Sequence, residues 1–148
     1  MAQLEIVYFE TNKPKPRIER TDMLCYIEEQ REPTVWTGVP MLGISLEATR
    51  VMPGHRDHVY VPWHPKFPID EIIRNILAFA GRKEAASITI LMPKHFPEAY
   101  VGRRLHDVKE HVIGPAVSTI KNSRRDKVVL IFASRGSYSV AFEEANAL

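Results

Sequence analysis

The first half of the chain alternates between short hydrophobic stretches and turn-forming residues, which predicts strands rather than helices. Residues 4–9 and 23–28 are rich in β-branched and aromatic side chains, and residues 35–39 form a weaker third candidate. At residues 44–48 apolar and polar side chains alternate with a period of two, which is typical of a strand with one solvated face. We expect these strands to form an antiparallel meander.

The second half adds helical periodicity to this pattern. Residues 59–63 resemble a strand, and an amphipathic helix is predicted to begin near Pro68. Gly81, followed by Arg82 and Lys83, is the predicted stop signal of this helix. Its apolar stripe consists of residues spaced three and four apart, namely Ile69, Ile72, Ile73, Ile76 and Ala80. A strand at 87–92 and a second helical segment from Pro97 follow, and the Gly114-Pro115 pair should kink or split that segment.

The last third predicts the centre of the sheet. Residues 127–133 are almost all apolar, as in a strand that is covered on both faces. Residues 134–137 are predicted to form a turn, and residues 138–142 a final strand that returns beside the buried one. We therefore expect one α/β domain over residues 1–148, with α+β as the other possibility.

In this fold the antiparallel N-terminal strands join a β-α-β-α-β-β unit in one mixed sheet that is packed by two main helices. The later strands are expected to run parallel through right-handed helical crossovers.

Composition narrows the class of protein. The 148 residues are 45% hydrophobic and 26% charged, as is usual for a soluble globular domain. The single cysteine, Cys25, excludes an intramolecular disulfide and indicates a reducing compartment. The N-terminal residues do not resemble a secretory signal, and the longest apolar run is too short to span a membrane. We expect a cytoplasmic protein that does not associate with membranes.

Charge is unevenly distributed along the chain although the net charge is only +2. Residues 94–135 contain nine Lys or Arg against four Asp or Glu, whereas the last thirteen residues carry only two charges, both acidic. This basic excess indicates an anion-binding face, and the alternative is an ordinary solvated helix surface.

Histidines are concentrated in the middle of the chain, where His55, His58 and His64 lie near Arg56 and Asp57. Their spacing matches no established metal-binding motif, so we expect no metal and no cofactor. The same histidines could instead perform acid–base chemistry on a phosphodiester, with Arg56 beside His58. No Ser or Thr lies two residues after any histidine, which removes the motif of two-histidine phosphodiesterases.

Several other groups could bind phosphate, and each also has a purely structural interpretation. Arg103 and Arg104 could belong to a salt-bridged helix face, and the cations at 121–127 could offset a helix dipole. The loop at 134–137 offers hydroxyls, a guanidinium and backbone N–H groups, or is a plain turn. Tyr60 and Trp63 could stack on bases.

The leading hypothesis is a small non-catalytic protein that binds a phosphate-bearing ligand, either nucleic acid or a nucleotide. A histidine-dependent phosphodiester hydrolase that uses His55, His58 or His64 is the alternative, and a protein–protein adaptor or inhibitor is a further one. A homodimer or a protein partner is compatible with each of these three hypotheses. The predicted ligand-binding residues are Arg56, Tyr60, Trp63, Arg103, Arg104, Arg124, Arg125, Ser134 and Arg135.

Overall fold

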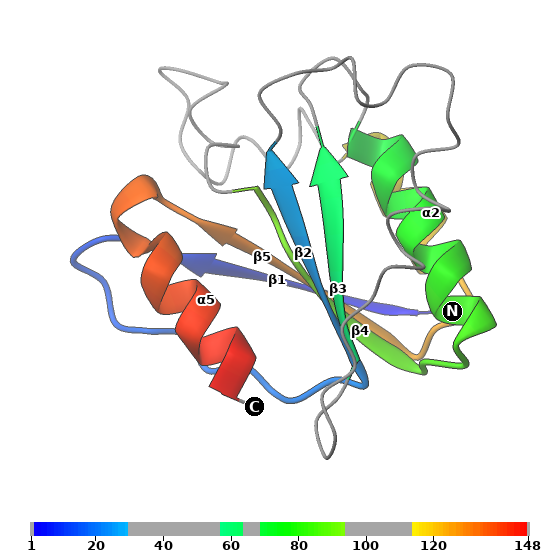
Figure 1. The fold of residues 1–148 in the computed structure, drawn as a ribbon, viewed down its shortest axis with the longest axis horizontal. Coiled ribbons are helices and arrows are strands. Elements are labelled where there is room, and N and C mark those ends of the chain that lie inside the picture. The colour runs from blue at the N-terminus through cyan, green and yellow to red at the C-terminus, as the bar shows by residue number, and fades with distance from the viewer. Residues whose placement is uncertain (1, 30–56, 64–68, 94–113, 148) are drawn as a thin grey trace.

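A computed structural model describes residues 2–29, 57–63, 69–93 and 114–147 of the chain. In this part of the chain five strands form one sheet with helices on both sides (Figure 1). The elements in chain order are β1 (Gln3–Phe9), β2 (Met23–Glu29), β3 (Asp57–Trp63), α2 (Ile69–Arg82), β4 (Ser87–Leu91), α4 (Gly114–Lys121), β5 (Lys127–Ala133), the 3₁₀ helix η4 (Arg135–Ser137) and α5 (Tyr138–Ala147).

The sheet is parallel at every pairing of the described strands, in the order β1-β5-β4-β2-β3. The predicted antiparallel N-terminal meander and mixed sheet are therefore wrong. After β1 the chain does not turn back beside it but crosses to the fourth position of the sheet, and Ile18 is buried on the way. A strand-like sequence predicts which residues form a strand, but it does not predict whether the neighbouring strand runs parallel or antiparallel to it. The positions of the strands were therefore predictable and their directions were not. The candidate strands at 35–39 and 44–48 lie outside the described residues.

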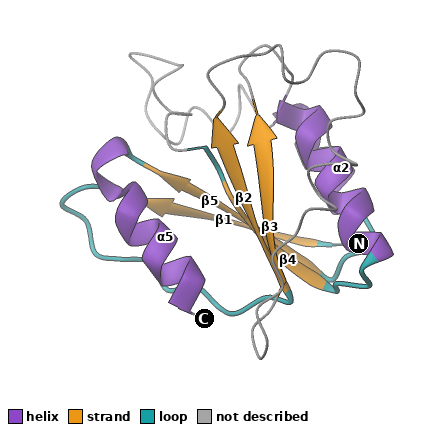
Figure 2. Ribbon diagram, in the orientation of Figure 1, coloured by secondary structure: helices purple, strands orange, loops and turns teal. Residues whose placement is uncertain are grey.

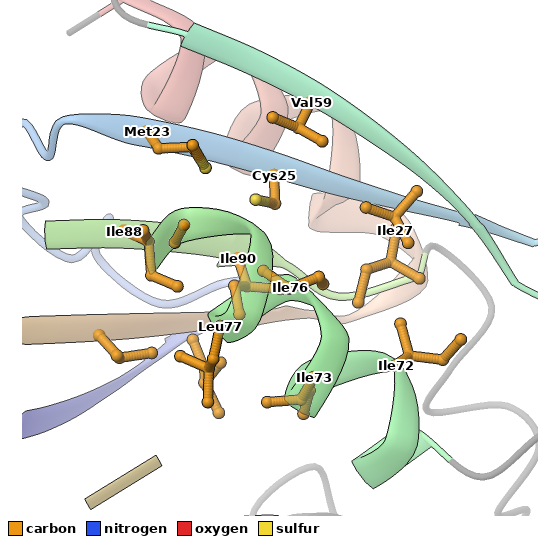
Figure 3. Close-up of a cluster of buried hydrophobic side chains, with 14 of the residues drawn as sticks. Met23, Cys25, Ile27, Val59, Ile72, Ile73, Ile76, Leu77, Ile88 and Ile90 are labelled. Atoms are coloured by element: carbon orange, nitrogen blue, oxygen red, sulfur yellow. The ribbon is translucent and has the colours of Figure 1, made fainter. Parts of the chain in front are cut away.

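Two hydrophobic clusters cover the two faces of the sheet. The larger joins α2 and α4 to one face, and Figure 3 shows Ile72, Ile73 and Ile76 of α2 against the strand residues. The smaller cluster joins Ala141 and Ala145 of α5 to the opposite face. Figure 2 shows α2 and α5 on different sides of the strands. Hydrophobic clusters on both faces are typical of a parallel sheet.

The prediction for β5 is confirmed in extent and in environment. Every residue from Val128 to Ala133 is buried, and β5 pairs with β1 on one side and with β4 on the other. The strands β1, β2, β3 and β4 also agree closely with the hydrophobic stretches in the sequence. Their positions were predictable because each combines β-branched residues with nearby turn formers.

The predicted final strand at 138–142 is wrong, because this segment begins the helix α5. Tyr138, Val140 and Phe142 alternate with smaller residues and so imitate a strand. The buried positions are instead Ala141 and Ala145, which are spaced by four, while the side chain of Val140 is 36% exposed. A helix is favoured here because the face of β5 opposite α2 needs a cover that a hairpin strand could not supply.

The helix α2 is confirmed, but it does not stop at Gly81. It continues to Arg82, and Glu84 takes the left-handed position after it, with a φ angle of 56°. The N–H of Glu84 donates to the carbonyl of Gly81 at 3.1 Å, and the N–H of Ala85 donates to that of Ala80 at 3.0 Å. These two bonds form a Schellman motif in which a glutamate occupies the position that usually favours glycine.

The helix α4 begins at the Gly114-Pro115 pair that was expected to kink or split a longer helix. Residues 94–113, which include the predicted start of that segment at Pro97, lie outside the described residues. No described helix has the length and apolarity that crossing a membrane requires.

Replacing Glu84 by glycine should stabilise the protein. A residue with a β-carbon pays roughly 1–2 kcal/mol in the left-handed conformation, and part of the gain is cancelled by the greater freedom of glycine in the unfolded chain. We expect the free energy of unfolding in urea to rise by about 0.5–1 kcal/mol in Glu84→Gly. Glu84→Ala keeps the β-carbon and should give no increase, so an equal gain in both variants would contradict this explanation.

The thiol of Cys25 should be unreactive in the folded protein. It is fully buried on β2, and this burial raises its pKa from the ordinary value of 9.0 to about 12. The unfolded chain therefore loses the thiol proton above pH 9 while the folded chain keeps it, so stability should fall as the pH rises from 9 to 12. We expect no labelling by a thiol reagent at pH 8 until urea unfolds the chain.

The pH dependence can be assigned to this residue with the variant Cys25→Ala. Between pH 8 and pH 10 the native chain should lose about 1.4 kcal/mol more stability than the variant. Rapid labelling at pH 8 without denaturant, or the same loss in both chains, would show that the thiol is accessible.

Candidate functional site

The parallel sheet has two chemically different edges. All strands begin at one edge, here called the amino edge, and end at the other, the carboxyl edge. A strand of seven residues spans about 20 Å, which is therefore the separation of the edges along one strand. Residues that belong to opposite edges cannot contact the same small ligand group.

The predicted site residues are divided between these edges. Arg124 and Arg125 precede β5 and lie at the amino edge, whereas Ser134 and Arg135 follow β5 at the carboxyl edge. Trp63 is the last residue of β3, so it also belongs to the carboxyl edge. These predicted residues therefore do not lie together at one edge of the sheet.

Other predicted residues lie within β3 or outside the described residues. His58 and Tyr60 are in β3, where their register partners are Leu24 and Tyr26 of β2. The predicted residues outside the described part of the chain are His55, Arg56, His64, Arg103 and Arg104.

The hydroxyls of the carboxyl edge hold the chain after β1 against the chain after β5. The N–H of Thr11 donates to Oγ of Ser134 at 3.3 Å, and Oγ of Ser134 donates to Oγ of Ser137 at 3.0 Å. The hydroxyls of Thr11 and Ser137 are 3.3 Å apart. A β-carbon on Gly136 would lie 3.1 Å from the Thr11 hydroxyl oxygen, so the segments are closely packed. The predicted turn at 134–137 is thus a 3₁₀ helix that leads into α5.

A cavity of about 230 Å³ lies beside this hydroxyl cluster and is lined in part by Lys13 and Lys15. Both cations are paired with carboxylates. Nζ of Lys13 is 3.2 Å from the Glu10 carboxylate, and Nζ of Lys15 is 2.9 Å from that of Glu144. The hydrogen bond from Lys15 to Glu144 raises the pKa of Lys15. The cavity therefore offers little positive charge to an anion.

The amino edge carries basic residues that are not paired in this way. The helices α2 and α4 both run back along the sheet, so their last turns lie at this edge. The end of α2 lies near the N-terminus in Figure 1, and the N–H of Ala2 donates to the carbonyl of Lys121 in α4 at 3.1 Å. Arg82 is the last residue of α2, and Lys83 comes directly after it. Lys121 is the last residue of α4, and Arg124 lies in the loop between α4 and β5. All four side chains are exposed. Within the described part of the chain, no carboxylate forms an ion pair with any of them.

Arg125 connects the two helix ends. Its guanidinium donates to the carbonyl of Ala80 at 3.4 Å and to that of Ala85. It also lies 3.8 Å from the place where a β-carbon of Gly81 would be. Arg125 is therefore a positioning residue that holds the end of α2 against the loop before β5. Lys127 forms two ion pairs, in which its Nζ lies 2.9 Å from the Glu5 carboxylate and 3.3 Å from the Glu19 carboxylate.

Arg82 and Lys83 both form a cation–π contact with the ring of Phe79. The guanidinium carbon of Arg82 and Nζ of Lys83 lie 5.5 and 5.6 Å from the ring centre of Phe79. Phe79 itself is only 2% exposed. These cation–π contacts keep the two charges at the end of α2 without neutralising them.

The positive charge of the two helix ends exceeds what their dipoles require. Residues 80–86 and 120–126 contain five basic and two acidic side chains, a net charge of +3. The C-terminus of each helix carries about −0.5 charge, so the two ends offset about one unit. A surplus of about +2 remains. We call Arg82, Lys83, Lys121 and Arg124 the amino-edge basic surface.

The sequence identified only half of this surface. Lys121 and Arg124 were recognised as part of a basic cluster, but Arg82 and Lys83 were interpreted as a helix stop signal. The proximity of the two segments arises from the sheet topology, and no local pattern shows it.

In the described residues, no group of three or more His, Cys, Asp or Glu side chains could hold a metal ion.

Comparisons with known proteins add no family to this description. No family model matches the chain, and neither a curated protein nor a solved structure is significantly similar to it.

The neighbouring residues Arg124 and Arg125 should respond differently to the same substitution. Arg125→Gln should lower the free energy of unfolding by about 1–3 kcal/mol, because the carbonyls of Ala80 and Ala85 lose a charged donor. Arg124→Gln should stay within about 0.5 kcal/mol of the native chain, as is usual for an exposed side chain. Urea unfolding measures both values, and equal losses would show that Arg125 has no special structural role.

Proposed function

We propose that the chain binds a phosphate-bearing ligand, and specifically nucleic acid, through the amino-edge basic surface. The observation that carries this proposal is the presence of four exposed cations at two adjoining helix ends, with no carboxylate of the described residues paired to them. Exposed Lys and Arg side chains of this kind are the usual partners of backbone phosphates.

The distribution of these cations favours a polymer over a single nucleotide. Lys121 and Arg124 come from one helix end, and Arg82 and Lys83 come from another, so the charges are spread over a surface. Repeated phosphates can meet such charges one by one, whereas a lone nucleotide presents its charge at one point. The cavity at the carboxyl edge is a weaker candidate because its two lysines are already paired.

Binding of this type should depend steeply on salt. Each phosphate that is neutralised releases condensed counterions, and the slope of log Kobs against log salt is about −0.9 per contact for a duplex. Four contacts correspond to a slope of about −3.6.

The proposal can be tested by fluorescence anisotropy with a labelled double-stranded oligonucleotide at several salt concentrations. Lys121→Gln/Arg124→Gln should weaken binding by about tenfold or more and reduce the salt slope by about 1.8, because two contacts are lost. Its matched control is Lys13→Gln/Lys15→Gln, which removes the same charge from exposed lysines at the opposite edge. This control should bind within about twofold of the native chain.

Two results would count against the proposal. The first is that neither the duplex nor a single strand binds at low salt. The second is an equal loss of affinity in both double variants, which would mean that overall charge and not this surface is responsible.

A further inference from the structure

We infer that the amino-edge basic surface recognises the phosphates of its ligand alone, without stacking on the bases. The ligand class is therefore a strand of regularly spaced phosphodiesters. This inference rests on the proposed function and specifies which part of the nucleic acid is bound.

The aromatic ring associated with the surface is not available for stacking. Phe79 is 2% exposed, and the charged groups of Arg82 and Lys83 lie over its ring. A base could reach the ring only after both cations had moved away, and these are the cations that would bind the phosphates. Stacking and phosphate binding at the end of α2 therefore exclude each other.

Four other aromatic rings of the described residues pack within the protein. The rings of Tyr8 and Phe132 are stacked at 5.8 Å, and those of Tyr26 and Phe142 are 5.0 Å apart. The hydroxyl of Tyr26 also donates to the side chain of Asn146 at 2.9 Å. These rings belong to the hydrophobic clusters that join the sheet to its helices.

The tryptophan that the sequence suggested for stacking lies at the wrong edge. Trp63 ends β3 at the carboxyl edge, about 20 Å along the strand from the amino edge. That distance corresponds to about six steps of a duplex at 3.4 Å each. Trp63 therefore does not belong to the amino-edge basic surface.

A phosphate-only surface predicts that removal of the bases has little effect on affinity. Stacking of one base on an aromatic side chain is worth about 1–3 kcal/mol, or about 5-fold to 150-fold in affinity. Phosphate contacts are unchanged when the bases are absent, provided that the number and spacing of phosphates stay the same.

The test is a competition experiment with a labelled single-stranded oligonucleotide bound to the full chain at low salt. The unlabelled competitors are the same strand and an abasic strand of equal length with the same number of phosphates. We expect the two to compete within about threefold of each other. Lys121→Gln/Arg124→Gln should weaken both competitors by the same factor.

The possible outcomes separate the two proposals. An abasic strand that competes tenfold or more worse than the ordinary strand would overturn the phosphate-only inference and leave nucleic-acid binding intact. A labelled strand and a labelled duplex that both fail to bind at low salt would overturn the proposed function and this inference with it.

Discussion

The burial of β5 on both faces is the constraint on which the rest of the described structure depends. From Val128 to Ala133 each side chain is enclosed, so helices must cover the sheet on two sides. The helices α2 and α4 cover one side, and α5 covers the other. Parallel sheets are typically enclosed in this way, and between parallel strands the chain must return to the amino edge. The same requirement brings the ends of α2 and α4 together and so assembles the amino-edge basic surface.

The sequence predicted the elements better than their connections. Strand positions and the helix α2 follow from local hydrophobic periods, which depend on neighbouring residues only. Strand direction and order depend on where the chain crosses the sheet, and the crossing after β1 carries no helical pattern that would announce it. The segment that begins at Tyr138 shows a second limit. Its large apolar residues alternate as in a strand, but the small residues Ala141 and Ala145 determine how it packs.

For the candidate site, charge composition alone could not distinguish residues that face a ligand from residues that hold the fold. Arg124 and Arg125 are adjacent residues of the same type. The side chain of Arg124 is exposed, whereas that of Arg125 donates to carbonyls at the end of α2. Arg82 and Lys83 were missed because a basic residue at the end of a helix already has a sufficient local explanation. Only the surplus of charge that appears when two helix ends meet suggests a further role.

The pairing of the first described strand with the last one has a consequence for how the protein folds. Gln3 pairs with Lys127, so the contact closes a loop of more than one hundred residues. The ion pairs of Lys127 with Glu5 and Glu19 also join residues that are more than one hundred positions apart. Closing so long a loop has an entropic cost that nearby contacts do not have. During synthesis β1 emerges before the other described strands but has no partner among them until β5 is complete. The edge strand β1 is therefore joined to the described sheet late.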